Sequence, residues 1–179
     1  MAGNATIYRA SLNIANMDAH YYNEHSLTLA QHPSESDLRL MVRLTAFALN
    51  ADENLTFTKG ISQDDEPDLW KKNMGGEVEL CIILGQPDDK RIKKACGVSK
   101  EVIIYTYQEG MAAAWLKQNE KILKRFNNLK VVALSFNDDI ELLCKRSMNL
   151  QCNITDNELT LINDERSIIV HENTLIAAS

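Results

Sequence analysis

The sequence predicts a mixed α/β (α+β) fold, in which helices flank a mixed β-sheet and extra strands lie near both ends of the chain. Three observations favour this class. Strand-like runs fill 5–31, strand-like and helix-like segments alternate over 55–146, and short runs with polar turns follow residue 148. Alternating strands and helices are typical of a sheet covered by helices, whereas short runs joined by turns are typical of antiparallel strands. We therefore expect one sheet with both kinds of neighbour.

Length and composition predict a single globular domain over residues 1–179. The chain has 179 residues, of which 45% are hydrophobic and 25% charged, enough for a sizeable core. The formal net charge of −6 argues against a surface devoted to nucleic acid or membrane, since such surfaces need excess Lys and Arg. A local basic patch is compatible with this charge.

The cysteines and the apolar runs predict the compartment. The four cysteines, Cys81, Cys96, Cys144 and Cys152, show neither a C-x-x-C pair nor the density of a disulfide scaffold, which favours reduced thiols without structural zinc. The opening MAGNATIYRA lacks the basic start and apolar core of a signal peptide. No apolar run approaches the roughly 18 residues of a membrane span. We expect a cytoplasmic protein without a membrane segment.

The first elements are two strands and a helix. Residues 5–17 and 24–31 are rich in Ile, Thr, Tyr and Leu with partial alternation, which predicts a hairpin with a longer loop. His32-Pro33 then ends the second strand, with His32 ordering the turn. The run Ser34-Glu35-Ser36-Asp37 matches a capping box, in which a Ser side chain bonds the backbone three residues on. Apolar residues at three- and four-residue spacing follow, so we expect a long amphipathic helix ending near residues 50–52.

The middle of the chain alternates between strands and helices. Residues 55–60 predict a short strand, Pro67 opens a helical turn capped by Glu66, and 77–84 form an interior strand because the run is almost wholly apolar. A helix over 87–96 carries acids in its first turn and lysines in its last, which complements the helix dipole, and Gly97 ends it. The remaining expectations are strands at 102–107 and 129–136, helices at 110–124 and 137–146, and then a strand meander with a turn at 156–157.

The segment 64–95 carries the residues with recognisable chemistry. Four carboxylates surround Pro67 and Glu79 stands in the following strand, before a basic run; they are Asp64, Asp65, Glu66 and Asp68, and then Lys90, Arg91, Lys93 and Lys94. Carboxylate oxygens suit Mg²⁺ or Mn²⁺, and a nearby ammonium stabilises charge on a phosphate under attack. This combination favours a site for metal and phosphate.

Several strings of the sequence resemble the YaeQ family of small bacterial proteins, and they span essentially the whole chain. These are SLTLAQHPSES with Arg39 and Arg43 downstream, LTFTKG, DDEPDLW and LGQPDDKRIKKAC, in the order and spacing of that family. The resemblance implies a fold related to the PD-(D/E)xK nucleases, a restriction-endonuclease-like core in which a helix and a bent mixed sheet present acids to one or two Mg²⁺ ions. It does not imply a defined activity.

The resemblance also implies roles for particular residues. Glu35, Asp68 and Glu79 would be the catalytic acids, with Asp68 and Glu79 as the metal ligands and Lys93 or Lys94 as a migrated lysine. Two departures oppose catalysis. Cys81 stands two residues after Glu79, where the lysine belongs, and Ile83 replaces the second acid of the family pattern I-D-L-W-I-E-L-G. Since alternate residues of a strand share a face, Glu79 would be the only acid beside them.

Each candidate also has a structural explanation. Glu79 could be a strand acid near a sheet edge, or one paired with a buried arginine such as Arg39 or Arg43, because buried charges are normally paired. Helix caps and first turns account for Asp68 and Glu35, and a solvated last turn accounts for Lys93 and Lys94. Trp70 and Trp115 fit core anchors better than base-stacking platforms.

Three functions remain open on the sequence. The first is a degenerate nuclease-like site that binds nucleic acid or phosphate without efficient hydrolysis, using Arg39, Arg43 and Arg91. The second is an active Mg²⁺-dependent phosphodiesterase, and the third is a non-catalytic module that binds a protein partner. Cys81 and Ile83 favour the first.

Overall fold

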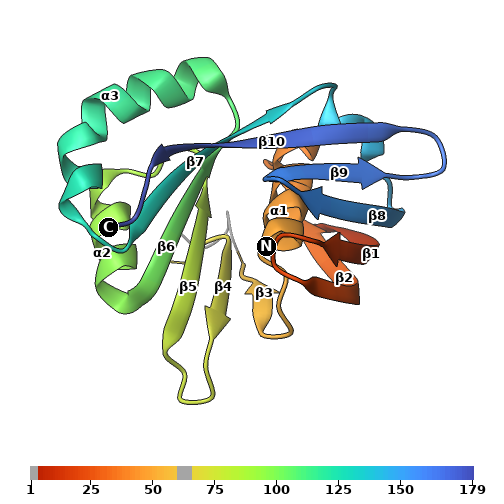
Figure 1. Cartoon of the computed structure of the whole chain (residues 1–179), viewed down its shortest axis with the longest axis horizontal. Coiled ribbons are helices and arrows are strands. Elements are labelled where there is room, and N and C mark those ends of the chain that lie inside the picture. Colours follow the sequence, from red (N-terminus) through yellow and green to blue (C-terminus); the bar gives the residue numbers. More distant parts are fainter. Residues whose placement is uncertain (1–3, 60–65) are drawn as a thin grey trace. The chain divides into compact units, whose positions relative to one another are not determined.

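The computed structural model describes residues 4–59 and 66–179, which fall into two compact units that we describe separately. Unit 1 comprises Met1–Leu49 with Ser135–Glu172, and unit 2 comprises Asn50–Leu134 with Asn173–Ser179. Both contain strands and helices, so the mixed α/β class is confirmed (Figure 1). The prediction of one domain over 1–179 stays a prediction. Asp64 and Asp65 lie outside the described residues.

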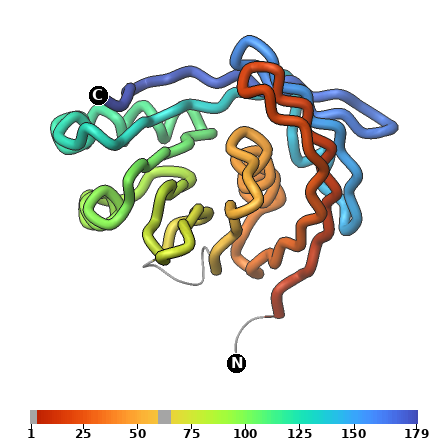
Figure 2. Tube along the Cα trace, turned by 60° about the horizontal axis from the view of Figure 1, so that its bottom comes forward, coloured from red at the N-terminus to blue at the C-terminus, as the bar shows by residue number. Residues whose placement is uncertain are grey.

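Unit 1 contains a mixed sheet and one helix. Its strands follow the order β2-β1-β8-β9-β10, and the bounds are Thr6–Asn16 (β1), Tyr21–Gln31 (β2), Ser147–Thr155 (β8), Glu158–Ile162 (β9) and Ser167–Ile176 (β10). β1 pairs antiparallel with β2 and parallel with β8. The helix α1 (Asp37–Leu49) lies beside this sheet (Figure 2), next to the short 3-10 helix η2 (Ile140–Leu143).

The opening hairpin is confirmed, but its loop is shorter than predicted. Asn16 pairs with Tyr21, so the connection spans only 17–20 and Tyr21 already belongs to β2. His20 has φ +53°, a left-handed conformation that a tight hairpin connection uses. The predicted turn at Asp156 and Asn157 is also confirmed, with φ values of +53° and +62°, as in a two-residue hairpin turn.

α1 begins where the sequence predicts but differs from the predicted helix in its burial. The backbone N–H of Arg39 donates to the Ser36 hydroxyl at 3.1 Å, so a Ser of the predicted run 34–37 caps the helix through the backbone three residues on. Ser34 takes part in the turn that His32 orders, where its backbone N–H donates to His32 Nδ1. Residues 40–48 are all buried, including Arg43 and Thr45, so the helix lacks the exposed face of an ordinary amphipathic helix.

Unit 2 contains a second mixed set of strands and two helices. The strands follow the order β7-β6-β5-β4-β3, with bounds Leu55–Phe57 (β3), Leu69–Lys72 (β4), Val78–Leu84 (β5), Ser99–Thr106 (β6) and Leu129–Phe136 (β7). β5, β6 and β7 are parallel, whereas β3, β4 and β5 are antiparallel neighbours. The helices α2 (Asp89–Val98) and α3 (Glu109–Arg125) are the crossovers that parallel strands require.

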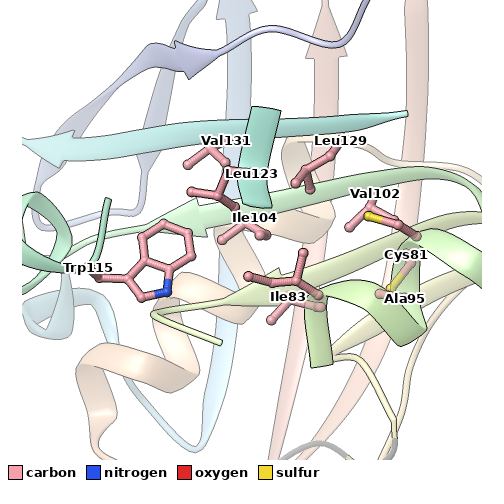
Figure 3. Packing of buried hydrophobic residues seen from close by; sticks show 11 residues of the cluster. Cys81, Ile83, Ala95, Val102, Ile104, Trp115, Leu123, Leu129 and Val131 are labelled. Carbon is pink, nitrogen blue, oxygen red and sulfur yellow. The ribbon is translucent and has the colours of Figure 1, made fainter. Parts of the chain in front are cut away.

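The core of unit 2 lies between these strands and the two helices. Figure 3 shows side chains of β5, β6 and β7 gathered against Ala95 of α2 and Trp115 and Leu123 of α3. Cys81 and Ile83 of β5 belong to this buried cluster. Trp115 is buried, as predicted, and its indole N–H donates to the Pro87 carbonyl at 2.8 Å, which fixes α3 to the start of α2. No described helix has both the length and the apolar character needed to cross a membrane.

Two local predictions in unit 2 were wrong. Residues after Pro67 form the strand β4 and no helical turn, because the Asp68 N–H donates to the Ile82 carbonyl at 2.9 Å and the Asp68 carbonyl accepts from Thr58 N–H at 3.1 Å. Pairing on both sides holds this segment extended. Gly97 does not end α2, which continues to Val98.

Candidate functional site

The candidate site is a pocket of unit 2 with a volume of about 630 Å³. It is formed by β4, β5, α2 and the first residue of β6. Its lining includes three cations of α2, three polar residues and an apolar wall; these are Lys90, Arg91 and Lys94, then Gln86, Asp88 and Ser99, then Pro67, Trp70, Val78, Cys81, Ile83, Pro87, Ala95 and Val98. A basic rim over an apolar floor suits a ligand that has both an anionic and an apolar part.

The sequence of α2 places the three cations on the pocket. Asp88 caps the helix by accepting from the Arg91 N–H at 2.8 Å, which confirms the predicted acidic start. Ile92 is buried in the core, and the exposed Lys90 and Lys94 are one turn apart on a different side of the helix. The helix therefore anchors itself by its apolar side and presents its cations to the pocket.

Arg91 and Asp68 connect α2 to the paired strands β4 and β5. Arg91 Nη2 donates to the Glu66 carbonyl at 2.9 Å and lies 3.9 Å from Asp68 Oδ2. Asp68 is fully buried, and its Oδ2 accepts from the Leu84 N–H at 2.8 Å. A buried carboxylate normally needs such partners, so Asp68 stabilises the strands and orients Arg91.

The floor of the pocket is neutral. Burial raises the pKa of the Cys81 thiol to about 12, against the opposing effects of Ser99 and the Arg91 charge. The thiol is therefore protonated at neutral pH and is a poor nucleophile. Ile83 beside it is aliphatic and buried, so neither of these two lining residues of β5 contributes a charge to the pocket.

Glu79 does not share the pocket face of Cys81 and Ile83, contrary to the alternation that the sequence predicts. The register between β4 and β5 shifts, because Lys71 pairs with Leu80 and Lys72 pairs with Val78. Glu79 is the extra residue of this bulge, and Val78 takes the place on the pocket wall. Glu79 is half-buried and makes no hydrogen bond or ion pair with another described residue.

Two buried polar atoms of the pocket residues lack hydrogen-bond partners among the described residues. They are Ser99 Oγ and Gln86 Nε2. Ser99 lies beside the Cys81 thiol and lowers its pKa, but no hydrogen bond of normal geometry joins the two side chains. A buried polar group without a partner costs about 1–3 kcal/mol, so two such groups at one pocket indicate a place where a ligand supplies the partners.

Glu35 belongs to unit 1 and has a different environment. Its carboxylate is buried and accepts from Arg39 Nη1 at 2.8 Å, from Arg43 Nε at 3.0 Å and from Arg43 Nη2 at 2.7 Å. Arg43 Nη2 also donates to the Ala30 carbonyl at 3.0 Å. Pairing with Arg39 or Arg43 was one structural explanation of Glu79, and it is not found, because Glu79 has no ion pair among the described residues.

The remaining predicted lysine, Lys93, is placed away from the pocket lining. It is exposed and lies 3.9 Å from Asp89 in an i,i+4 pair, whereas Lys94 lines the pocket. Among the residues that the structure describes, no three His, Cys, Asp or Glu side chains gather as a metal site would require. The structure brings Asp68, Arg91 and Lys94 into one region of unit 2, without Glu79 or Lys93.

Trp70, Gln86 and Ser99 are pocket residues that the sequence reasoning did not select as site residues. Trp70 is half-buried, so the expectation of a core anchor was only partly right. It pairs with Cys81 across β4 and β5. The place of Trp70 on the pocket could have been predicted if residues 69–72 had been recognised as a strand, because a residue paired with Cys81 on the neighbouring strand lies on the same face of the sheet.

Comparison with known proteins identifies the family. The family model described as "YaeQ protein" matches residues 1–172. The chain belongs to the YaeQ family. Among its relatives, the YaeQ protein of Escherichia coli (strain K12) is 42% identical over 176 residues, covering 96% of each chain, and that of Salmonella typhi is 40% identical over 163 residues, covering 90% of each.

Two crystal structures of YaeQ proteins share the fold. The YaeQ protein from Xanthomonas axonopodis pv. citri has a TM-score of 0.91 and 43% identity, over 97% of this chain and 99% of that one. The YaeQ protein from Pseudomonas syringae has a TM-score of 0.90 and 28% identity, over 97% of each chain. The resemblance drawn from the sequence is thus confirmed at the level of the family.

Proposed function

We propose that the pocket of unit 2 is a degenerate nuclease-like site that binds the phosphates of nucleic acid in the cytoplasm without efficient hydrolysis. The observation that carries the proposal is the lining itself, where Lys90, Arg91 and Lys94 stand over a floor of Cys81 and Ile83. Phosphate contacts by Lys and Arg supply most of the affinity of proteins for nucleic acid. A local basic pocket reconciles such binding with a net charge of −6.

The chemistry of the floor is the reason to expect binding without catalysis. Hydrolysis by a metal-activated water needs carboxylates around the ion and a base or cation beside the attacked phosphate. Cys81 is neutral because its pKa is raised to about 12, and Ile83 has no ligand atom. We propose that this fold derives from a restriction-endonuclease-like core. In such a core, a lysine would stand at the position of Cys81 and an acid at the position of Ile83.

The active alternative would use Mg²⁺ held by Asp68 and Glu79 of unit 2, with Lys94 or Lys93 beside the phosphate. Asp68 already accepts from the Leu84 N–H and faces Arg91. Glu79 belongs to a bulge outside the described pocket lining. A bound Mg²⁺ would therefore have to compete with the Leu84 N–H and Arg91 for Asp68, and Glu79 would have to move to reach the ion. For this reason we rank the active alternative second.

The test is binding of labelled single- and double-stranded DNA and RNA, measured by fluorescence anisotropy at several salt concentrations. Replacing Lys90 and Lys94 together by Glu should weaken binding at least tenfold and reduce the salt slope by about 0.7–0.9 for each phosphate that is no longer neutralised. Lys93→Glu is the control, because it makes the same kind of substitution on the same helix outside the pocket lining, with half the change of charge of the double variant. It should leave affinity within about twofold of wild type.

Two results would overturn the proposal. The first is wild-type protein that binds none of the nucleic acids at low salt, and the second is equal weakening by Lys93→Glu, which would indicate a general effect of charge. Cleavage is checked with Mg²⁺ and Mn²⁺, and calorimetric titration of both ions is run with Glu79→Ala beside wild type. Metal-dependent cleavage that disappears in Glu79→Ala would support the active phosphodiesterase instead.

A further inference from the structure

The indole of Trp70 forms an aromatic wall of the unit 2 pocket. Trp70 is half-buried on β4, opposite Cys81 on β5, and the Lys72 ammonium lies 3.9 Å from the centroid of its ring. An indole with a cation on one face and a pocket at its side is polarised and partly desolvated. Nucleobases stack on such side chains, and this contact tolerates any base because every base has a π-face.

The buried polar atoms of the pocket can bond the edge of a base. Gln86 Nε2 and Ser99 Oγ are buried and without partners among the described residues, and Ser99 as a whole is 9% exposed. An amide nitrogen and a hydroxyl can both donate to the carbonyl oxygens on a pyrimidine or guanine edge. The exposed cations Lys90 and Lys94 lie on α2, so the pocket separates a place for phosphate from a place for the base.

The volume of the pocket also argues for an unpaired nucleotide. Its volume of about 630 Å³ falls in the range of sites that enclose a small molecule, which a phosphate group alone does not fill. Bases within a duplex are stacked and paired, so their faces and Watson–Crick edges are not available to an aromatic wall and buried donors. A single strand or a strand end presents both.

We propose that this pocket holds the base of an unpaired nucleotide, stacked on Trp70 with its edge bonded by Ser99 and Gln86, so that the ligand is single-stranded nucleic acid. The inference rests on the proposed function, since Lys90, Arg91 and Lys94 hold the neighbouring phosphates. It adds that affinity depends on the bases as well as on the backbone.

The experiment compares a labelled oligothymidylate with an abasic oligonucleotide of the same length and backbone, by fluorescence anisotropy. Wild-type protein should bind the oligothymidylate roughly tenfold more tightly than the abasic strand, as expected for one stacked base. Trp70→Leu should remove this ratio while leaving the affinity for the abasic strand unchanged. Trp70→Phe retains a ring and should keep most of the ratio.

Ser99→Ala gives a second variant that does not depend on the fold tolerating a change at Trp70. It removes a hydroxyl that has no partner among the described residues, so the urea midpoint should stay the same or rise. Binding of the oligothymidylate should nevertheless weaken severalfold, with no change for the abasic strand. Ser26→Ala, at an exposed serine of β2, is the matched control and should change neither quantity.

Intrinsic fluorescence supplies an independent readout. The chain has two tryptophans, and Trp115 is buried with its N–H bonded to Pro87. Quenching by the oligothymidylate should therefore be large in wild type and absent in Trp70→Phe. If the protein bound the oligothymidylate and the abasic strand equally, and the Lys90 and Lys94 variant weakened both, the proposal of a base pocket would be wrong. The proposed phosphate site would still be supported. No binding of either strand would overturn both.

Discussion

The carboxylate of Glu35 in unit 1 and the cations of α2 in unit 2 are both charged groups set against buried surface, but their partners differ. Arg39 and Arg43 together supply three short hydrogen bonds to Glu35, in a cluster built within one unit. Around α2, the lining combines Lys90 and Lys94 at the surface with the buried donors of Gln86 and Ser99, which lack partners among the described residues.

This difference in partners distinguishes a charge that stabilises the fold, Glu35, from charges that can bind a ligand, the cations of α2. A buried carboxylate that is saturated by arginines has no remaining capacity for a metal ion or a proton transfer without breaking existing bonds. A pocket with exposed cations and unsatisfied donors loses stability in the unliganded protein and regains it when a ligand supplies the acceptors. Sequence chemistry alone gives both regions the same description, an acid or base near a predicted helix.

The largest expected effect comes from breaking the Glu35 cluster. Glu35→Ala leaves Arg43 buried without its carboxylate, and removal of one partner from a buried pair costs about 3–5 kcal/mol. Urea denaturation should show this loss in the free energy of unfolding. Glu24→Ala, at an exposed position of β2, is the control and should stay within about 0.5 kcal/mol of wild type.

A double variant sharpens this prediction. Glu35→Leu combined with Arg43→Met removes both charges, so the protein should recover part of the stability that Glu35→Ala loses. Neither variant should change the ratio of affinities for oligothymidylate and abasic strands, which belongs to unit 2. A loss below about 1 kcal/mol in Glu35→Ala would mean that the cluster does not stabilise the fold.

A smaller effect is expected at Asp68, the buried acid of unit 2. Asp68→Ala removes the acceptor of the Leu84 N–H and the partner of Arg91, which lies at the longer distance of 3.9 Å. An unsatisfied buried donor costs about 1–3 kcal/mol, so the urea midpoint should fall less than in Glu35→Ala.

Asp68→Ala should also weaken oligonucleotide binding severalfold, because Arg91 loses the group that orients it. Asp68→Asn is the informative control, since it keeps an acceptor for Leu84 but not the charge. Wild-type affinity in both variants would remove Arg91 from the proposed phosphate site.

Much of the fold could be predicted because its signals are local. Alternation of apolar residues defines β1, β8 and β9, and the turn at Asp156 and Asn157 tolerates left-handed backbone. The start of α2 follows from the Asp88 cap. The error at Pro67 has the opposite cause: a proline after an acid favours a helix start locally, but pairing with Ile82, far along the chain, decides for a strand.

The site could be predicted only in part, for the same reason. The basic run of α2 correctly indicated that Arg91 and Lys94 belong to one site, since both line the pocket. The face of Glu79 could not be predicted, because the bulge opposite Lys71 and Lys72 depends on the pairing of two strands. Glu35 lies four residues before Arg39, a spacing typical of a local ion pair, so part of its role was readable from the chain.

The smallest expected effect concerns Asp18, an exposed acid in the hairpin loop of unit 1. Its carboxylate accepts from the backbone N–H groups of Asp156 at 2.8 Å and Asn157 at 2.9 Å, and these bonds lower the pKa of Asp18. A group whose pKa is lower in the folded state stabilises the protein above its unfolded pKa and loses that contribution as the pH falls through the folded value.

Asp18→Asn therefore tests a pH dependence with a defined sign. Wild type should be slightly more stable than the variant near neutral pH, and the difference should shrink as the pH falls below the ordinary range of aspartate. Thermal denaturation of both proteins over this acid range measures it. A difference that persists unchanged in acid would mean that the geometry of the side chain, and not its charge, joins the β1–β2 loop to the β8–β9 turn. In either case the effect stays within unit 1, so oligonucleotide binding in unit 2 should be the same in both proteins.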